Sequence, residues 1–453
     1  MSAEGDITAE AVAPDRLPRK AGRVAYRDVF AIPEFRALWG AQLLSVAGDQ
    51  LARVALTVLV YDRTRSPLLA AVTFMVSVVP VFIGGVTLAG LADRFPRRTV
   101  MIACDAVRCA LVLVMALPGM PLAALVALLA VVTLVGAPFT AERAALYPDV
   151  LPGEKYVTGT AITLTTNQFA QVAGFAAGGA VVGLLGTRTS LVIDAATFAV
   201  SAVIVRCFVR RGTTGTRRDA RPAAESAAQH ADAAQHADAA EHADAAQHAD
   251  AGGADGGLAG AARMVFSNPA MRLPMLFGWL AAFYNAPEGV AAPLAATFGG
   301  GALTVGALLA AQAFGETAGM LAFGRLVRPA ARLRAMGPLA VATCAVPVLF
   351  AADPARAAAL LLLAVSGAFG AYQIAANAAF VSAVPAAARA RAFGLAQGGM
   401  SLGQGVVMVL AGAAAQRFAP ATVVAVAGGA GAVCAACIAA SWARSRKAAA
   451  PGG

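Results

Sequence analysis

Apolar segments about as long as a membrane is thick recur along almost the whole chain. An α-helix rises 1.5 Å per residue, so about 20 apolar residues cross the ~30 Å hydrocarbon core of a bilayer. Such segments lie near 36–60, 67–91, 99–117, 121–141, 157–184 and 189–208, and again near 272–292, 302–324, 336–352, 357–383, 393–415 and 421–443. The sequence therefore predicts an all-α membrane protein with twelve transmembrane helices.

The composition agrees with a chain whose solvent is mostly lipid. Of the 453 residues, 59% are hydrophobic and only 13% are charged, whereas a soluble protein is usually ~25% charged. Residues 1–25 are polar and have no apolar core, so no secretory signal is expected there.

The segments fall into two sets of six, which predicts two six-helix bundles. The predicted domains are an N-terminal tail over 1–34, a first bundle over 35–208, a low-complexity linker over 209–262, a second bundle over 263–443 and a C-terminal tail over 444–453.

The positive charges test the helix count and set the orientation. With both termini in the cytoplasm, 28 of the 35 Lys and Arg residues fall on the cytoplasmic side, five fall in outer loops and two lie within helices. This asymmetry matches the positive-inside rule and places the protein in the cytoplasmic membrane with both ends inside. It also explains the net charge of +10 without a nucleic-acid partner.

The linker contains a repeated unit that includes every histidine of the protein. Residues 229–252 read QHADAA, QHADAA, EHADAA, QHADAG. Weak metal binding is one interpretation of a His-containing tract, and a solvated low-complexity linker is the preferred one. No metal site or cofactor is predicted, and no histidine lies in the membrane part to relay protons.

Six cysteines fall in apolar stretches and are interpreted as small buried hydrophobes. They are Cys104, Cys109, Cys207, Cys344, Cys434 and Cys437. The last two have the spacing of a redox or metal pair, but no third ligand is near them in the sequence.

The most specific local signal follows the second segment, where residues 90–98 read GLADRFPRR. This short loop combines Asp93 with Arg94, Arg97 and Arg98. A carboxylate here can face the positive end of a neighbouring helix, and the arginines can pair with acids or lipid phosphates. The loop is thus predicted to lock one conformation and release it in another.

This loop resembles the loop 2–3 signature of the major facilitator superfamily, and the resemblance extends over nearly the whole chain. Residues 139–152 (FTAERAALYPDVLP) and 193–202 (IDAATFAVSA) are similar to segments of the branch that holds macrolide and siderophore exporters. The resemblance implies a secondary transporter, and it implies a conformational gate formed by the loop arginines and Asp93 together with Asp105, Arg108, Glu142 and Arg143.

The fifth segment contains Gly174, Gly178 and Gly179 within the run GFAAGG. Small residues at this spacing let another helix approach closely. The run resembles a glycine motif of family antiporters that export their substrates, with Phe175 where proline would stand. Export is the preferred interpretation, and ordinary small-residue packing is the alternative.

Ionisable residues inside a membrane are costly and are therefore functional candidates. Asp49 and Arg53 are one helical turn apart, and Asp49 lies about 13 residues into its segment, ~20 Å from the start. Glu316 is similarly deep. A carboxylic acid in a low-dielectric cavity holds its proton more strongly, so Asp49, Arg53 and Glu316 are predicted to couple transport to protons.

Two alternatives remain open for these charges. The first alternative is that Asp49 and Arg53 form a static salt bridge that only positions their helix. The second is that Asp194 and Glu288 lie near the outer interface of the membrane. Family proton antiporters often have an arginine in the fourth helix, yet residues 122–141 contain no charge. Arg53 or Arg108 is the candidate for the missing cation.

Uncharged polar residues are the candidates for lining a substrate cavity. They are Gln42, Asn167, Gln171, Tyr284, Asn285, Gln312, Gln373 and Asn377. The apolar remainder suits a hydrophobic or amphipathic ligand better than a sugar.

The predicted function is export of such a molecule, an antibiotic, drug or siderophore, by proton antiport with alternating access. The alternative is an importer or facilitator of a small metabolite on the same fold. An enzyme is not expected, and the chain contains no Gly-Lys pair, so a phosphate-binding loop for ATP is excluded. The partners expected are a small molecule, protons and lipid, and the resemblance implies a monomer.

If the repeat is only a linker, deletion of residues 226–254 leaves transport near the wild-type level. The measurement is drug accumulation in an efflux-deficient host, normalised to the amount of protein in the membrane. A large loss of activity with normal insertion would show that the repeat has a function of its own.

Overall fold

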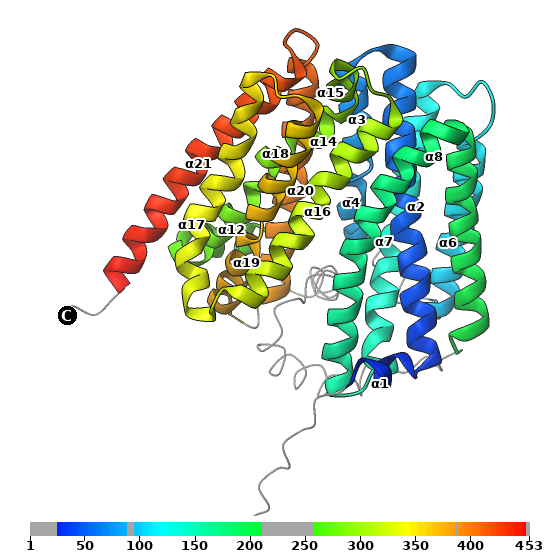
Figure 1. Cartoon of the computed structure of the whole chain (residues 1–453). Coiled ribbons are helices and arrows are strands. Elements are labelled where there is room, and N and C mark those ends of the chain that lie inside the picture. Colours follow the sequence, from blue (N-terminus) through cyan, green and yellow to red (C-terminus); the bar gives the residue numbers. More distant parts are fainter. Residues whose placement is uncertain (1–24, 88–94, 211–257, 386–387, 450–453) are drawn as a thin grey trace, which may run out of the picture.

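A computed structural model describes residues 25–87, 95–210, 258–385 and 388–449, and these residues form helices. Asp93, Arg94, the His-containing repeat, most of the predicted N-terminal tail and residues 450–453 lie outside the described residues. Figure 1 shows two bundles side by side, the first from α2 to α8 and the second from α12 to α21.

After the short α1 (Tyr26–Phe30), the described part of the first bundle contains six helices. They are α2 (Pro33–Thr64), the pair α3 (Pro67–Val76) and α4 (Val79–Thr87), α6 (Arg97–Met115), α7 (Leu122–Val150) and α8 (Glu154–Phe208). α8 is two spans in one, because Gly186 has a φ of 80° and breaks the helix there. The bundle therefore crosses six times.

The second bundle repeats this arrangement with more interrupted helices. After α11 (Leu258–Ser267) come α12 (Pro269–Trp279), α13 (Ala281–Tyr284), α14 (Ala286–Gly289) and α15 (Ala291–Thr297), which together make one broken span. The remaining spans are α16 (Ala302–Leu326), α17 (Pro329–Ala345) with a 3-10 turn (Val346–Ala352), α18 (Arg356–Phe369) with α19 (Tyr372–Ala383), α20 (Arg389–Ala414) and α21 (Pro420–Ala449).

Proline explains two of the interruptions. Pro80 has no N–H to donate one turn back, and the second span opens at Ser77 and Val78 between α3 and α4. Pro287 and Pro293 act in the same way between α13 and α15. In a membrane such breaks are tolerated only where protein or a water-filled cavity satisfies the freed backbone groups.

The prediction of twelve spans in two bundles is confirmed. Eight of the described helices are individually long and apolar enough to cross a membrane, and the broken or more polar ones complete the set. Two details differ from the sequence-based boundaries: α11 begins inside the predicted linker, and α21 continues into the predicted tail.

The interpretation of all six cysteines as buried is wrong for three of them. Cys104 and Cys344 are buried and Cys109 is half-buried, but Cys207, Cys434 and Cys437 are exposed on the outer surface of the helices. In a membrane protein this surface meets lipid, so an apolar side chain is suited to either position.

Each bundle has its own apolar core, and a third cluster crosses between them. Val54, Phe74 and Phe175 of the first bundle pack with Val290 and Leu308 of the second in one buried group. The bundles meet along two seams, one between α3 and α20 and the other between α8 and α16. In Figure 1, α16 leans toward α8 across the middle of the molecule.

The two ends of the molecule can be named from the chain path. The terminal end is where α1 and the start of α11 lie, and the distal end carries the loops after Thr64 and Ala414. Near the distal end, Gln416 donates a hydrogen bond of 3.2 Å to the Ser66 hydroxyl and so joins the two bundles.

Two glycines of the fifth span pack against α2, and the third packs against α16. A Cβ at Gly174 would lie 2.9 Å from the Gln50 Cβ, and one at Gly178 would lie 3.0 Å from the Leu51 Cα. A Cβ at Gly179 would lie 2.8 Å from the Gly306 Cα. The close approach predicted for this motif therefore involves both bundles.

Substitution of Gly179 by alanine is expected to force α8 and α16 apart. Such overpacking costs about 1–3 kcal/mol, so Gly179→Ala should lower the melting temperature of the purified protein and impair transport. Gly183→Ala is the matched control, because the nearest atom to its Cβ would be 3.8 Å away. Equal melting temperatures for the two variants would contradict the tight seam.

Candidate functional site

A small polar cavity of about 100 Å³ lies inside the first bundle, enclosed by α2, α6, α7 and the second half of α8, with the break between α3 and α4 at its rim. We call it the Asp49 cavity. It holds a few waters at most, so it is too small for a drug-sized ligand. Its polar lining is Gln42, Ser45, Asp49, Arg53, Ser77, Arg108, Thr133, Thr140 and Asp194.

Arg108 is the centre of this cavity. Its Nη2 donates to the Asp49 carboxylate at 2.5 Å, and its Nη1 donates to the Ser45 hydroxyl at 3.1 Å. The guanidinium carbon lies 4.0 Å from the ring centroid of Phe198, at a distance typical of a cation–π contact. The Arg108 side chain is 5% exposed and that of Asp49 is 33% exposed, so the ion pair has one buried and one accessible partner.

The cavity fits the absence of charge from residues 122–141 of α7. α7 presents Gly136 to the arginine, and a Cβ there would lie 3.4 Å from the guanidinium carbon of Arg108. The cation thus projects from α6 into the space that α7 leaves open. Two roles were predicted for Arg108: a member of the gate, or the cation that replaces the arginine expected in the fourth helix. In the structure it is paired with Asp49.

Asp194 belongs to the same cavity. It is 1% exposed, and glycine at position 48 allows its approach, since a Cβ there would collide with the Asp194 carboxyl. The alternative that placed Asp194 near the outer interface is therefore wrong. Asp105 is also fully buried, but it lies outside the cavity lining and accepts a 2.6 Å hydrogen bond from Ser201.

A polar cluster faces the first bundle from the second, and we call it the Glu316 cluster. Gln312 donates to the Asn285 side chain at 2.6 Å and to the Tyr284 carbonyl at 3.3 Å. Gln373 donates to the Tyr284 hydroxyl at 2.7 Å. Four of the predicted cavity residues are therefore one hydrogen-bonded group, assembled at the break between α13 and α14.

Two carboxyl groups complete the Glu316 cluster. The Glu316 carboxyl interacts with the Gln312 side chain and electrostatically with Glu288. Glu288 is half-buried among these groups, and its placement near the outer interface stays a prediction.

Arg53 joins the two charged groups across the bundle interface. It interacts electrostatically with Asp49 of its own helix and with Glu288 of the opposite bundle. Its Nη2 donates to the Ser77 carbonyl at 3.1 Å, at the break in the second span. Asp49 therefore has its direct ion pair with Arg108, whereas Arg53 donates to a backbone carbonyl at the break.

The gate residues form contacts at the terminal end. Arg97 pairs with Asp149 at 2.8 Å and with Glu142 at 3.9 Å, and Arg98 donates to the Arg206 carbonyl. Arg143 is buried and donates to the Tyr147 hydroxyl at 3.1 Å. These contacts tie the start of α6 to the ends of α7 and α8, and none of them reaches the second bundle.

The remaining predicted cavity residues do not form one group. Gln42 lines the Asp49 cavity, and Asn167 and Gln171 are half-buried on α8. Their neighbour Gln168 contacts the Met320 sulfur of α16 at 3.9 Å. Asn377 is half-buried on α19. Sequence reasoning missed Ser45, Ser77 and Phe198, whose residue types are too common in such helices to stand out.

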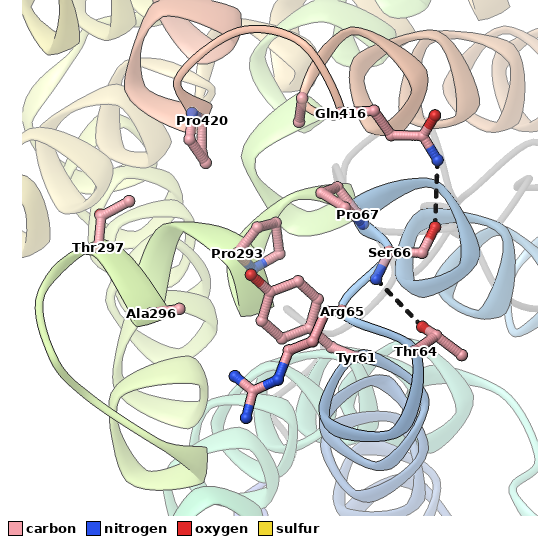
Figure 2. A pocket seen from close by; sticks show the side chains of 11 residues that line it. Tyr61, Thr64, Arg65, Ser66, Pro67, Pro293, Ala296, Thr297, Gln416 and Pro420 are labelled. Atoms are coloured by element: carbon pink, nitrogen blue, oxygen red, sulfur yellow. Dashed lines mark hydrogen bonds between the residues drawn. The ribbon is translucent and has the colours of Figure 1, made fainter.

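A separate vestibule opens between the bundles at the distal end and has a volume of about 600 Å³. Figure 2 shows Tyr61 and Arg65 on one side and Pro293 and Thr297 on the other, with Gln416 bonded to Ser66 at the rim. Arg65 is the one charged side chain in its lining.

A match to a protein-family model shows which family the chain belongs to. Residues 38–353 match the model of the Major Facilitator Superfamily. The chain belongs to this superfamily. No curated protein sequence matches it at a significant level.

Solved transporters share the fold at low identity. The nucleoside transporter NupG, as a point mutant, superposes with a TM-score of 0.66 at 13% identity, over 90% of this chain and 99% of its own. A POT family transporter in complex with a thioalcohol-conjugated peptide gives 0.67 at 12%, over 93% and 99%. A bacterial homologue of the human lysosomal transporter Spinster, inward-facing and occupied, gives 0.64 at 17%, over 94% and 98%.

The superfamily and the fold together define the class of protein. The chain is a multi-pass membrane transporter of small molecules and not an enzyme. The Asp49 cavity and the Glu316 cluster lie on either side of the interface along which the two bundles meet.

Arg108 donates two hydrogen bonds from one guanidinium, to Asp49 and to Ser45. We therefore predict that lysine cannot replace it. Lysine keeps the charge but lacks the planar fork that binds Asp49 and Ser45 while stacking on Phe198. Losing a hydrogen bond to a charged group costs about 1.5–3 kcal/mol, so Arg108→Lys should lower the melting temperature. Arg63→Lys is the control, because Arg63 donates one exposed hydrogen bond, to the Met120 carbonyl. Identical melting curves for both variants would contradict the assignment.

Proposed function

We propose that the chain is a proton-coupled exporter of a small hydrophobic or amphipathic molecule, an antibiotic, drug or siderophore. It acts as a monomer in the cytoplasmic membrane with both termini inside, so the terminal end is cytoplasmic. The observation that carries the proposal is the set of half-buried carboxyl groups, Asp49, Glu288 and Glu316, that lie on both sides of the bundle interface with Arg53 between them.

Charge compensation links these carboxyls to alternating access. A buried ion is tolerated only when paired or neutralised. A proton on Asp49 removes the charge that holds Arg108, and a proton on Glu288 removes the charge that attracts Arg53 across the interface. Protonation of Glu288 therefore weakens an attraction across the bundle interface, whereas protonation of Asp49 weakens a contact inside the first bundle and an attraction on the interfacial Arg53. A proton can thereby bias one arrangement over another.

The substrate is expected to bind between the bundles, at the Glu316 cluster. The Asp49 cavity is too small for such a ligand. Tyr284, Asn285 and Gln373 offer a few placed polar groups beside apolar helices, as in ligand pockets generally. Asn167, Gln171 and Asn377 are further candidates, and Gln42 belongs with the proton site.

The direction of transport is proposed from sequence similarity. The segments 139–152 and 193–202 resemble macrolide and siderophore exporters, and Gly174, Gly178 and Gly179 occupy the place of an exporter motif. The gate of Asp93, Arg94, Arg97 and Arg98, with Glu142 and Arg143, would then close the cytoplasmic side when the bundles converge there.

Import or facilitated transport of a small metabolite is the second candidate. The similarity in fold to transporters of nucleosides and of peptides favours it. Hydrogen-bonding side chains in the Glu316 cluster would also suit a polar metabolite.

An efflux-deficient host expressing the protein should accumulate less of at least one compound from a panel of antibiotics and siderophores, and a protonophore should abolish the difference.

Asp49→Asn should reduce efflux roughly tenfold or more, equivalent to about 1.4 kcal/mol, while inserting normally. Asp62→Asn, at an exposed position of the same helix, is the control and should transport normally.

Three outcomes would contradict parts of this proposal. Full resistance with Asp49→Asn would remove the coupling role, and efflux that survives the protonophore would remove proton coupling. Greater accumulation in cells expressing the protein would indicate import.

A further inference from the structure

Asp194 occupies an unusual position for a carboxyl group. It is 1% exposed, it lines the Asp49 cavity, and its Oδ1 has no hydrogen-bond partner. Thr197, one turn later, donates to the Asp194 backbone carbonyl at 2.7 Å. The Thr197 hydroxyl also interacts with the Asp194 carboxyl. A buried carboxylate with an unpartnered oxygen is costly, so this position favours a neutral acid or a nearby cation.

The charges around Asp194 do not balance if every acid is ionised. α2 contributes Asp49 and Arg53, and α6 contributes Asp105 and Arg108. Arg53 is directed to the Ser77 carbonyl and toward Glu288. Over residues 122–141, α7 adds no charge, and the nearby Cys109 of α6 is a neutral thiol in its ordinary state.

Arg108 is therefore the cation that interacts with all three carboxyls, Asp49, Asp105 and Asp194. It is already committed to Asp49 at 2.5 Å, and Asp105 has the Ser201 hydroxyl. Asp194 interacts electrostatically with both Asp49 and Arg108, but no donor reaches its Oδ1. Asp105 also has an unpartnered Oδ1, but it lies outside the cavity lining. Of the two acids that line the cavity, Asp194 is the one without an ion pair.

We propose that Asp194 holds a proton when Arg108 is paired with Asp49, and that Arg108 moves to Asp194 when Asp49 is protonated. In this exchange the O–H bond on Asp194 breaks, an O–H bond forms on Asp49, and the guanidinium changes partner. Asp49, Asp194 and Arg108 therefore always hold one proton, one carboxylate and one guanidinium between them, so the net charge of these three side chains stays at zero.

The exchange gives the transporter a second proton site that differs in access from the first. Asp49 is one-third exposed and Asp194 is almost fully enclosed, so the first is placed to exchange protons with water and the second to store one. This consequence for transport rests on the proposed proton coupling, whereas the protonation state of Asp194 does not.

Infrared difference spectroscopy on the full-length protein, labelled with ¹³C at the aspartate side-chain carboxyl, tests the proposal. The label separates aspartic acids from Glu288 and Glu316. The wild type is expected to show a buried protonated-aspartate band that shifts in heavy water, and Asp194→Asn should lose it. Asp105→Asn, the buried control, should retain it.

Asp49→Asn provides the decisive second variant, because it leaves Asp194 in place. With Asp49 neutral, Arg108 should take Asp194 as its counter-ion, and the Asp194 acid band should disappear. Absence of this band in the wild type, or its persistence in Asp49→Asn, would overturn the proposal. The spectra need no transport, so either result is independent of whether efflux proves to be proton-driven.

Discussion

The ion pair of Arg108 with Asp49 is the interaction on which the rest of the first bundle depends. An unpaired arginine in a membrane interior is costly, and removing one partner of a buried pair leaves the other uncompensated. Around this pair the helices are built from small residues: Gly136 leaves room for the guanidinium, and Gly48 leaves room for Asp194. The charge thus determines where glycine is required on helices far apart in the sequence.

Polar groups inside the membrane also need partners in the second bundle, where the first span is broken. Prolines at 287 and 293 interrupt the helix, and the polar side chains of α16 and α19 gather where the backbone is freed. Discontinuous helices commonly mark the binding sites of secondary transporters. Here the break lies opposite Arg53, which is itself held at the break of the second span. The two irregular helices and the interfacial charges therefore occupy one region of the molecule.

Local features were predictable from the sequence and long-range partners were not. The spans follow from segment length, and the glycines of the fifth span follow from their spacing. The pairing of Asp49 with Arg108 was not predicted, because Arg53 is the nearer arginine along the chain and spacing along one helix says nothing about a neighbouring helix. The position of Asp194 along its segment suggested that it lies near the outer interface. Position along a helix does not tell which face of the helix a residue occupies, and Asp194 faces the cavity.

The central claim is that protonation of the Asp49–Arg108 pair changes the arrangement of the two bundles. The most direct test is the distance between spin labels at Leu117 and Ala352, which are exposed positions near the distal ends of the two bundles. The six native cysteines are replaced first. The wild type should change its distance distribution as the pH falls, and Asp49→Asn should keep one distribution at every pH. A pH response that is unchanged in Asp49→Asn, or that is absent from the wild type, would contradict the account.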